Sequence, residues 1–161
     1  MNNITPYLWF NSQAEEAATL YTSIFKDSRI MEVHRYGEAG PGPKGTAMIV
    51  AFEIAGQPFM ALNGGPRVKF TEAISFYVDC ETQTEVDDLW EKLSEGGEKQ
   101  PCGWLKDKYG VSWQIIPRAL PKLMADPDPE KSRRVMEAML QMGKIEIEGL
   151  EKAHRGPDSL G

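Results

Sequence analysis

His34 and Glu53 are the two candidates for a general base in the sequence. Both lie in segments that alternate like β-strands, 29–36 and 46–55, and His34 is expected to share a face with Ile30. An imidazole that titrates near neutral pH, or a carboxylate held near a ligand, could take a proton from a bound molecule. A surface histidine and a solvent-facing glutamate are the competing interpretations, so the catalytic residues stay unassigned.

The chain has two cysteines, Cys80 and Cys102, and neither belongs to a closely spaced pair of metal ligands. No basic residue stands beside Cys102 to lower the pKa of its thiol, so we do not expect it to act as a nucleophile. The sequence favours free thiols in a reducing compartment, with a disulfide between the two as the alternative.

The composition of the 161-residue chain limits the classes of function. Apolar residues make up 41% and charged residues 26%, which is enough core-forming material for a folded domain. The net charge of −6 argues against nucleic acid or an anionic membrane as a partner, because attraction to phosphate requires a basic patch. No apolar run is long enough to cross a membrane, and Met1–Ile4 lacks the pattern of a signal peptide, so we expect a cytoplasmic protein.

The same order of elements is expected twice along the chain. The first half is predicted to form a strand, a helix and three strands, over residues 4–10, 13–25, 29–36, 46–55 and 59–62. The second half begins again with a strand and a helix and then a hairpin, over residues 74–79, 82–93, 104–106 and 111–116. Thr5–Tyr21 aligns with Ile74–Trp90, which favours an internal repeat. Ser12 and Glu15 have the spacing of a capping box at the start of the first helix.

These patterns predict an α+β fold with two βαβββ repeats, residues 1–66 and 67–117, and a C-terminal helical extension, residues 118–161, within one structural domain. Prolines, Pro121 among them, punctuate the connection to an amphipathic helix over residues 130–142. The methionines of this helix suit packing in a core or at a dimer interface better than recognition of a cofactor.

Five stretches of the sequence resemble the PhnB-like group of the vicinal-oxygen-chelate superfamily, from residue 4 to about residue 150. They are ITPYLWFNSQAEEAATLY, MALNGG, ISFYVDCETQTEVDDLWEKL, CGWLKDKYGVSWQIIP and DPDPEKSRRVMEAML. The superfamily includes glyoxalase I, bleomycin-resistance proteins, fosfomycin-resistance enzymes and extradiol dioxygenases, and some members of the group are labelled 3-demethylubiquinone-9 3-methyltransferase. The resemblance implies a glyoxalase/bleomycin-resistance/dioxygenase-like curved-sheet cavity and a homodimer.

The resemblance also locates four positions where superfamily enzymes hold a divalent metal ion with His, Glu or Gln. In this sequence they fall on Thr5, on Leu62 or Asn63, on Ala73 or Ile74, and on Gln114. Only Gln114 is a plausible ligand, and one neutral amide does not hold zinc or nickel. We therefore expect no metal ion. The glycine-rich segment 37–45 joins two strands, which is unlike the strand-to-helix turn of a nucleotide or S-adenosylmethionine site, so we expect no cofactor.

Alternation along the strands predicts which side chains face the cavity. The expected ligand-binding residues are aromatic or carry a hydroxyl or amide group: Tyr7, Trp9, Asn63, Ser75, Tyr77 and Gln114. Such a lining is typical of a small-molecule site, although the same residues could instead be plain packed core. The leading hypothesis is a metal-free protein that binds a small, partly aromatic molecule. The alternatives are a glyoxalase-like or dioxygenase-like enzyme, with a makeshift metal site or acid–base chemistry, and a methyltransferase acting on a quinone.

Overall fold

The computed structural model describes residues 4–157, so the expectation about a signal peptide at Met1–Asn3 lies largely outside the described residues. The chain divides into two compact units between Phe70 and Thr71, and each unit contains one of the expected repeats. None of the described helices is long and apolar enough to cross a membrane.

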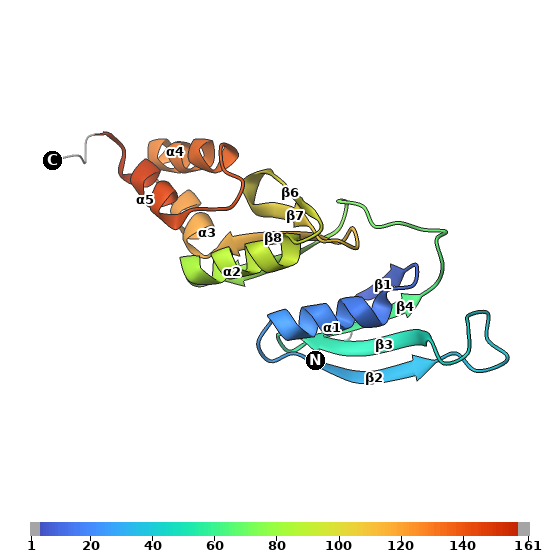
Figure 1. Ribbon diagram of the computed structural model, residues 1–161. Coiled ribbons are helices and arrows are strands. Elements are labelled where there is room, and N and C mark those ends of the chain that lie inside the picture. Colours follow the sequence, from blue (N-terminus) through green and yellow to red (C-terminus); the bar gives the residue numbers. More distant parts are fainter. Residues whose placement is uncertain (1–3, 158–161) are drawn as a thin grey trace. The chain divides into compact units, whose positions relative to one another are not determined.

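The first unit is a four-stranded sheet with one helix on one of its faces (Figure 1). Its elements are β1 (Tyr7–Phe10), α1 (Ala14–Ile24), β2 (Arg29–Arg35), β3 (Ala47–Ile54) and β4 (Gln57–Asn63). The strand order is β1-β4-β3-β2, with β1 parallel to β4 and the other pairs antiparallel. This is the predicted βαβββ unit.

Side-chain alternation explains why α1 covers only one face of this sheet. Leu8 and Phe10 of β1 are buried, as are the alternate residues of β3 and β4 that face the helix. Phe52 and Phe59 stack with ring centroids 5.4 Å apart. The helix presents three fully buried alanines, whose small side chains let it lie close to the sheet. The opposite face of the sheet is left without a helix of its own unit.

The start of α1 differs from the prediction. Ser12 and Glu15 form no capping box; the N-cap residue is Gln13, whose side chain makes no capping hydrogen bond. The first helical amide, Ala14 N, instead donates to Asn63 Oδ1 at 2.8 Å. A side chain from the end of β4 thus takes the place of the local cap, a tertiary contact that the spacing of Ser12 and Glu15 could not reveal.

The second unit repeats this arrangement and then adds helices (Figure 1). Its repeat consists of β5 (Ser75–Cys80), α2 (Gln83–Ser94), β6 (Glu98–Lys99), β7 (Trp104–Lys106) and β8 (Ser112–Pro117), with a short 3-10 turn at Pro101–Gly103. The strand order is β5-β8-β7-β6, and β5 runs parallel to β8. The predicted apolar stripe of α2 is buried against the sheet, and Thr82 Oγ1 caps the helix by accepting from Glu85 N at 3.2 Å.

The β7–β8 hairpin is organised by one buried carboxylate, Asp107, which is only 2% exposed. Its Oδ1 accepts from the amides of Tyr109 and Val111 at 2.9 and 3.0 Å, and its Oδ2 accepts from Trp113 Nε1 at 3.0 Å. Three donors satisfy the buried charge, so this turn has a structural role.

Three helices end the second unit: α3 (Ala119–Met124), α4 (Pro129–Leu140) and α5 (Ile147–Arg155). Helix α3 was not predicted, because Pro121 suggested a connection; in the first turn of a helix the missing amide of proline costs no hydrogen bond. The helices share one apolar core with the end of β8, formed by Ile116, Leu120, Val135, Ile145 and Leu150.

Hydrogen bonds also tie the chain after α4 to the repeat. Cys102 N donates to Met142 O and Gly103 N to Gly143 O, both at 2.8 Å. The Gln83 side chain bonds the backbone of Ile145 and Ile147 at 2.9 and 2.7 Å. The C-terminal helices are therefore an integral part of the second unit.

Candidate functional site

The face of the second sheet that points away from α2 brings together three of the predicted site residues. Tyr77 lies opposite Gln114 in the register of β5 and β8, and Ser75 lies opposite Ser112. Gln114 Nε2 donates to Ser75 Oγ at 2.9 Å, which fixes the orientation of the amide. Tyr77 remains 55% exposed. Partial burial, and then the charge of Asp79, raise the pKa of its phenol, so the group stays a neutral hydrogen-bond donor near pH 7.

This face continues into a pocket of about 570 Å³ that lies wholly within the second unit. The lining comes from the sheet, the 3-10 turn, α3 with the residue after it, and α4: Tyr77, Cys102, Trp104, Gln114, Ile116, Leu120, Pro121, Met124, Ala125 and Met139. None of these residues is charged. Ligand pockets typically measure about 300–1,000 Å³ and combine apolar walls with a few polar groups, which is the composition found here.

The helix side of this pocket was missed by the sequence analysis. Met139 belongs to the predicted helix whose methionines were assigned to a core or interface, and nothing in the spacing of Met124 and Met139 connects them with Tyr77 or Gln114. Their long, flexible thioether side chains can adapt to ligands of different shape.

The open face of the first sheet holds Tyr7 and Trp9, which lie on the opposite side of β1 from buried Leu8 and Phe10. Tyr7 is 49% exposed and lies opposite Met60 in the register of β1 and β4, and Trp9 lies opposite Leu62. Trp9 is held in place, because its Nε1 donates to Gly65 O at 3.0 Å and the guanidinium of Arg67 lies 5.1 Å from its ring.

Asn63 does not join the other predicted site residues. It pairs with Phe10 in register, and both ends of its amide serve the fold: Oδ1 accepts from Ala14 N, and Nδ2 donates to Ala47 O at 3.0 Å. An amide so engaged on the helix-covered side of the sheet is not placed to contact a ligand on the open face.

The two candidate bases lie on the strands β2 and β3, where His34 is exposed and the side chain of Glu53 is half-buried, at 23% exposed. His34 Nε2 is 3.2 Å from Glu32 Oε1, with the imidazole 54% exposed, and Glu53 Oε2 is 3.3 Å from Arg29 Nε. His34 is opposite Ile49 and Glu53 is opposite Arg29, so the two lie toward different ends of this strand pair. The two groups therefore do not lie together, and neither lines the pocket of the second unit.

The neighbours of His34 also differ in part from the prediction. A register shift between Ile30 and Glu32 places Ile30 opposite Phe52, whose ring is buried under α1, whereas Glu32 stays opposite Ala51. The irregularity turns Ile30 away from the face of His34, because one extra residue in a strand reverses the alternation.

The two cysteines differ in accessibility, and both are free thiols. Cys80 is buried, and burial raises the pKa of its thiol to about 12. Cys102 is partly exposed and lines the pocket of the second unit. Only Cys102 is therefore accessible to reagents in solution.

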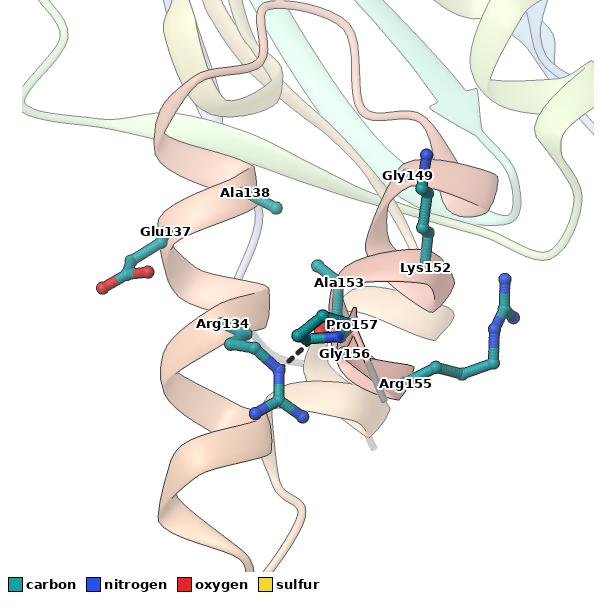
Figure 2. A pocket seen from close by; sticks show the side chains of 9 residues that line it. All are labelled: Arg134, Glu137, Ala138, Gly149, Lys152, Ala153, Arg155, Gly156 and Pro157. Carbon is teal, nitrogen blue, oxygen red and sulfur yellow. Dashed lines mark hydrogen bonds between the residues drawn. The ribbon is translucent and has the colours of Figure 1, made fainter. Parts of the chain in front are cut away.

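Among the further hollows at the surface, two lie beside residues already discussed or drawn in Figure 2. The first, of about 560 Å³, lies between α4 and α5; Figure 2 shows Glu137 and Arg155 pointing away from it, while Arg134 Nε donates to Ala153 O at 2.9 Å. The second, of about 350 Å³, is formed where the glycine-rich loop meets the ends of β1 and β4, beside Tyr36. In both hollows a polar side chain bonds the nearby backbone, since Tyr36 OH in the second donates to Asn63 O at 2.8 Å.

The side chains do not suit the metal ion used by enzymes of the resembled superfamily. Thr5 and Leu62 offer neither imidazole nor carboxylate, Ile74 is apolar, and the amide nitrogen of Gln114 is bonded to Ser75. Among residues 4–157, no three His, Cys, Asp or Glu side chains are grouped so that they could hold a metal ion. The glycine-rich segment connects β2 to β3, two antiparallel strands, and so does not form a strand-to-helix cofactor turn.

The repeated βαβββ unit, with its first and last strands parallel in each copy, is the fold of the glyoxalase/bleomycin resistance/dioxygenase superfamily. The fosfomycin resistance protein FosX of Listeria monocytogenes matches it with a TM-score of 0.50 at 16% identity, over 73% of this chain and 93% of that one. Within this class, the chain belongs to the family described as 3-demethylubiquinone-9 3-methyltransferase, whose model matches residues 2–116.

Solved structures support the same assignment. A PhnB protein of Bacillus cereus with the same methyltransferase label is 41% identical, with a TM-score of 0.68, over 72% of this chain and 99% of that one. Protein PA1353 of Pseudomonas aeruginosa has the same fold, with 22% identity and a TM-score of 0.62, over 73% of this chain and 98% of that one. No curated protein sequence matched. The family match ends at residue 116, so α3, α4 and α5 lie outside it.

Proposed function

We propose that this protein binds a small, uncharged, partly aromatic molecule on the open face of its sheets without using a metal ion. The supporting observation is the pocket of the second unit, in which aromatic and thioether side chains surround an oriented amide and no side chain is charged. Apolar walls with one or two fixed polar groups provide affinity and orientation at the same time. Binding alone requires no catalytic residue, which agrees with the positions of His34 and Glu53 outside this pocket.

The proposal is tested with a panel of neutral aromatic compounds, first by thermal unfolding and then by calorimetry. A ligand that binds the folded state raises its stability, by about 2.7 kcal/mol at a hundredfold excess over Kd. Tyr77→Ala is expected to weaken binding about tenfold, and Tyr7→Ala, in the first unit, reports whether that face also contributes. If no compound of the panel binds, the protein is not a receptor for this class of molecule.

The family description suggests a second candidate, transfer of a methyl group to a hydroxyl oxygen of a quinone ring. That reaction needs a methyl donor and a group to take the hydroxyl proton, whereas His34 is exposed and the glycine-rich segment between β2 and β3 is not a strand-to-helix cofactor turn. A hydroxylated quinone is nevertheless uncharged and flat, like the ligand proposed here. Calorimetry with S-adenosylmethionine separates the two candidates, because only the methyltransferase must bind it.

We further propose that the protein is a cytoplasmic homodimer. Apolar side chains that a monomer leaves exposed include Met136 and Leu140 on α4, which are 38% and 54% exposed. Light scattering checks the mass in solution, and a monomer at all concentrations would contradict the dimer.

A further inference from the structure

We infer, on the basis of the proposed binding function, that the ligand lies in the pocket of the second unit between the sheet and the helices α3 and α4. The C-terminal helices then form half of the binding site. The ligand class is a flat, uncharged ring compound with a hydroxyl or N–H group that donates to Gln114.

The shape of the pocket favours a flat molecule. Tyr77 and Trp104 line it from the sheet, and Pro121, Met124 and Met139 line it from the helices. A ring lying between these walls would contact aromatic faces on one side and polarisable sulfur atoms on the other.

The charges around the pocket favour an uncharged molecule. No side chain that lines the pocket is charged, and Arg118 Nε, two positions after the lining residue Ile116, is paired with Asp79 Oδ2 at 2.8 Å. An ionised ligand would lose its hydration without gaining an opposite charge, and burial of an unpaired charge is costly. The net charge of −6 adds a further penalty for anions.

The polar group of the site is Gln114. Its Nε2 donates to Ser75 Oγ, so the carbonyl oxygen Oε1 of the same amide is available as an acceptor. A ligand hydroxyl or N–H can satisfy it, and a ring without such a donor cannot.

The helix wall is fixed in place. Gly103, at the edge of the pocket beside Cys102, has φ +82°, and a Cβ there would lie 2.8 Å from Ile116 Cδ1. With the bonds from Cys102 and Gly103 to Met142 and Gly143, this close packing holds the C-terminal segment against β8. Because the family match ends at residue 116, the wall formed by α3 and α4 is a feature outside the matched region.

Cys102 provides a reporter for the site. It lines the pocket and is partly exposed, whereas the other cysteine, Cys80, is buried and resists alkylation because burial raises its thiol pKa to about 12. The probe is naphthol, a neutral flat ring with a hydroxyl group. At about ten times its Kd it should slow alkylation of Cys102 by iodoacetamide about tenfold, since the free fraction falls by that factor.

Two analogues and two variants test the chemistry and the place. Methoxynaphthalene, which lacks the donor, and the Gln114→Leu variant with naphthol should each bind about fivefold to tenfold more weakly. Naphthoate should bind at least about tenfold more weakly than naphthol. Ala125→Trp fills the pocket from an exposed position at the end of α3 and should abolish protection of Cys102. Glu151→Trp, at an exposed position of α5 outside the lining, is the matched control and should behave as wild type.

The outcomes separate this inference from the proposed function. Naphthol binding that leaves Cys102 unprotected, or that survives in Ala125→Trp, overturns the site and leaves the binding function standing. Equal affinity for naphthoate overturns the uncharged class of ligand. Absence of binding across the whole aromatic panel overturns both. If Ala125→Trp does not fold, protection of Cys102 in the wild-type protein still decides the location.

Discussion

Substitution of Asn63 tests whether this side chain stabilises the fold or contacts a ligand. The sequence placed it in the binding site, whereas the structure shows its amide joining α1 to the sheet through Ala14 N and Ala47 O. Loss of a helix-capping acceptor costs about 1 kcal/mol, and loss of a second partly buried hydrogen bond costs about as much. Asn63→Ala should therefore lower the free energy of unfolding by about 2 kcal/mol and leave the affinity for naphthol unchanged.

The matched control is Asn11→Ala, the same substitution at an exposed asparagine. It should change the free energy of unfolding by less than ~0.5 kcal/mol. Urea unfolding followed by circular dichroism gives the free energies, and calorimetry gives the affinities. A structural role of Asn63 is refuted if Asn63→Ala changes the free energy of unfolding by less than ~0.5 kcal/mol, the usual range of a surface substitution, while naphthol binding weakens.

Three further predictions concern the second unit. Asp107→Ala removes the acceptor of the indole N–H of Trp113 and of two backbone amides, so urea unfolding should show a free energy of unfolding lower by about 3 kcal/mol. A decrease below ~1 kcal/mol would contradict the structural role of this carboxylate. Gly103→Ala adds a Cβ at positive φ within 3.0 Å of Ile115 O and should cost about 1–3 kcal/mol by the same assay; a wild-type value would refute the close packing. A hydrogen bond from Asp128 N, and then the contact with His154 at 2.7 Å, lower the pKa of Asp126 in the folded protein. The ionised Asp126 therefore stabilises the fold above the ordinary aspartate pKa of about 4, and this stabilisation is lost as the pH falls through the lower pKa of the folded state. Unfolding measured between neutral and acidic pH should therefore depend less on pH in Asp126→Asn, and an unchanged profile would contradict this.

Local patterns in the sequence were sufficient to predict the repeat and its strand faces. Leu8 and Phe10 alternate with Tyr7 and Trp9, and each pair lies on one face of the sheet, because a strand reverses its side chains at every residue. The stripe of α2 was equally evident, since its apolar residues recur with helical spacing.

Contacts between distant segments could not be predicted in this way. Asn63 competes with Ser12 for the start of α1 only because β4 ends beside that helix. Met124 and Met139 reach the pocket of Tyr77 only because the C-terminal core packs on β8. The register shift near Ile30 likewise depends on the pairing of β2 with β3 and has no clear signal in the residue types.

The most direct test of the proposed binding site is a crystal structure of the protein with bound naphthol. We predict electron density for the ring between Tyr77 and Met139, with its hydroxyl within hydrogen-bond distance of Gln114 Oε1. A ring bound elsewhere, with this pocket filled only by water, would contradict it.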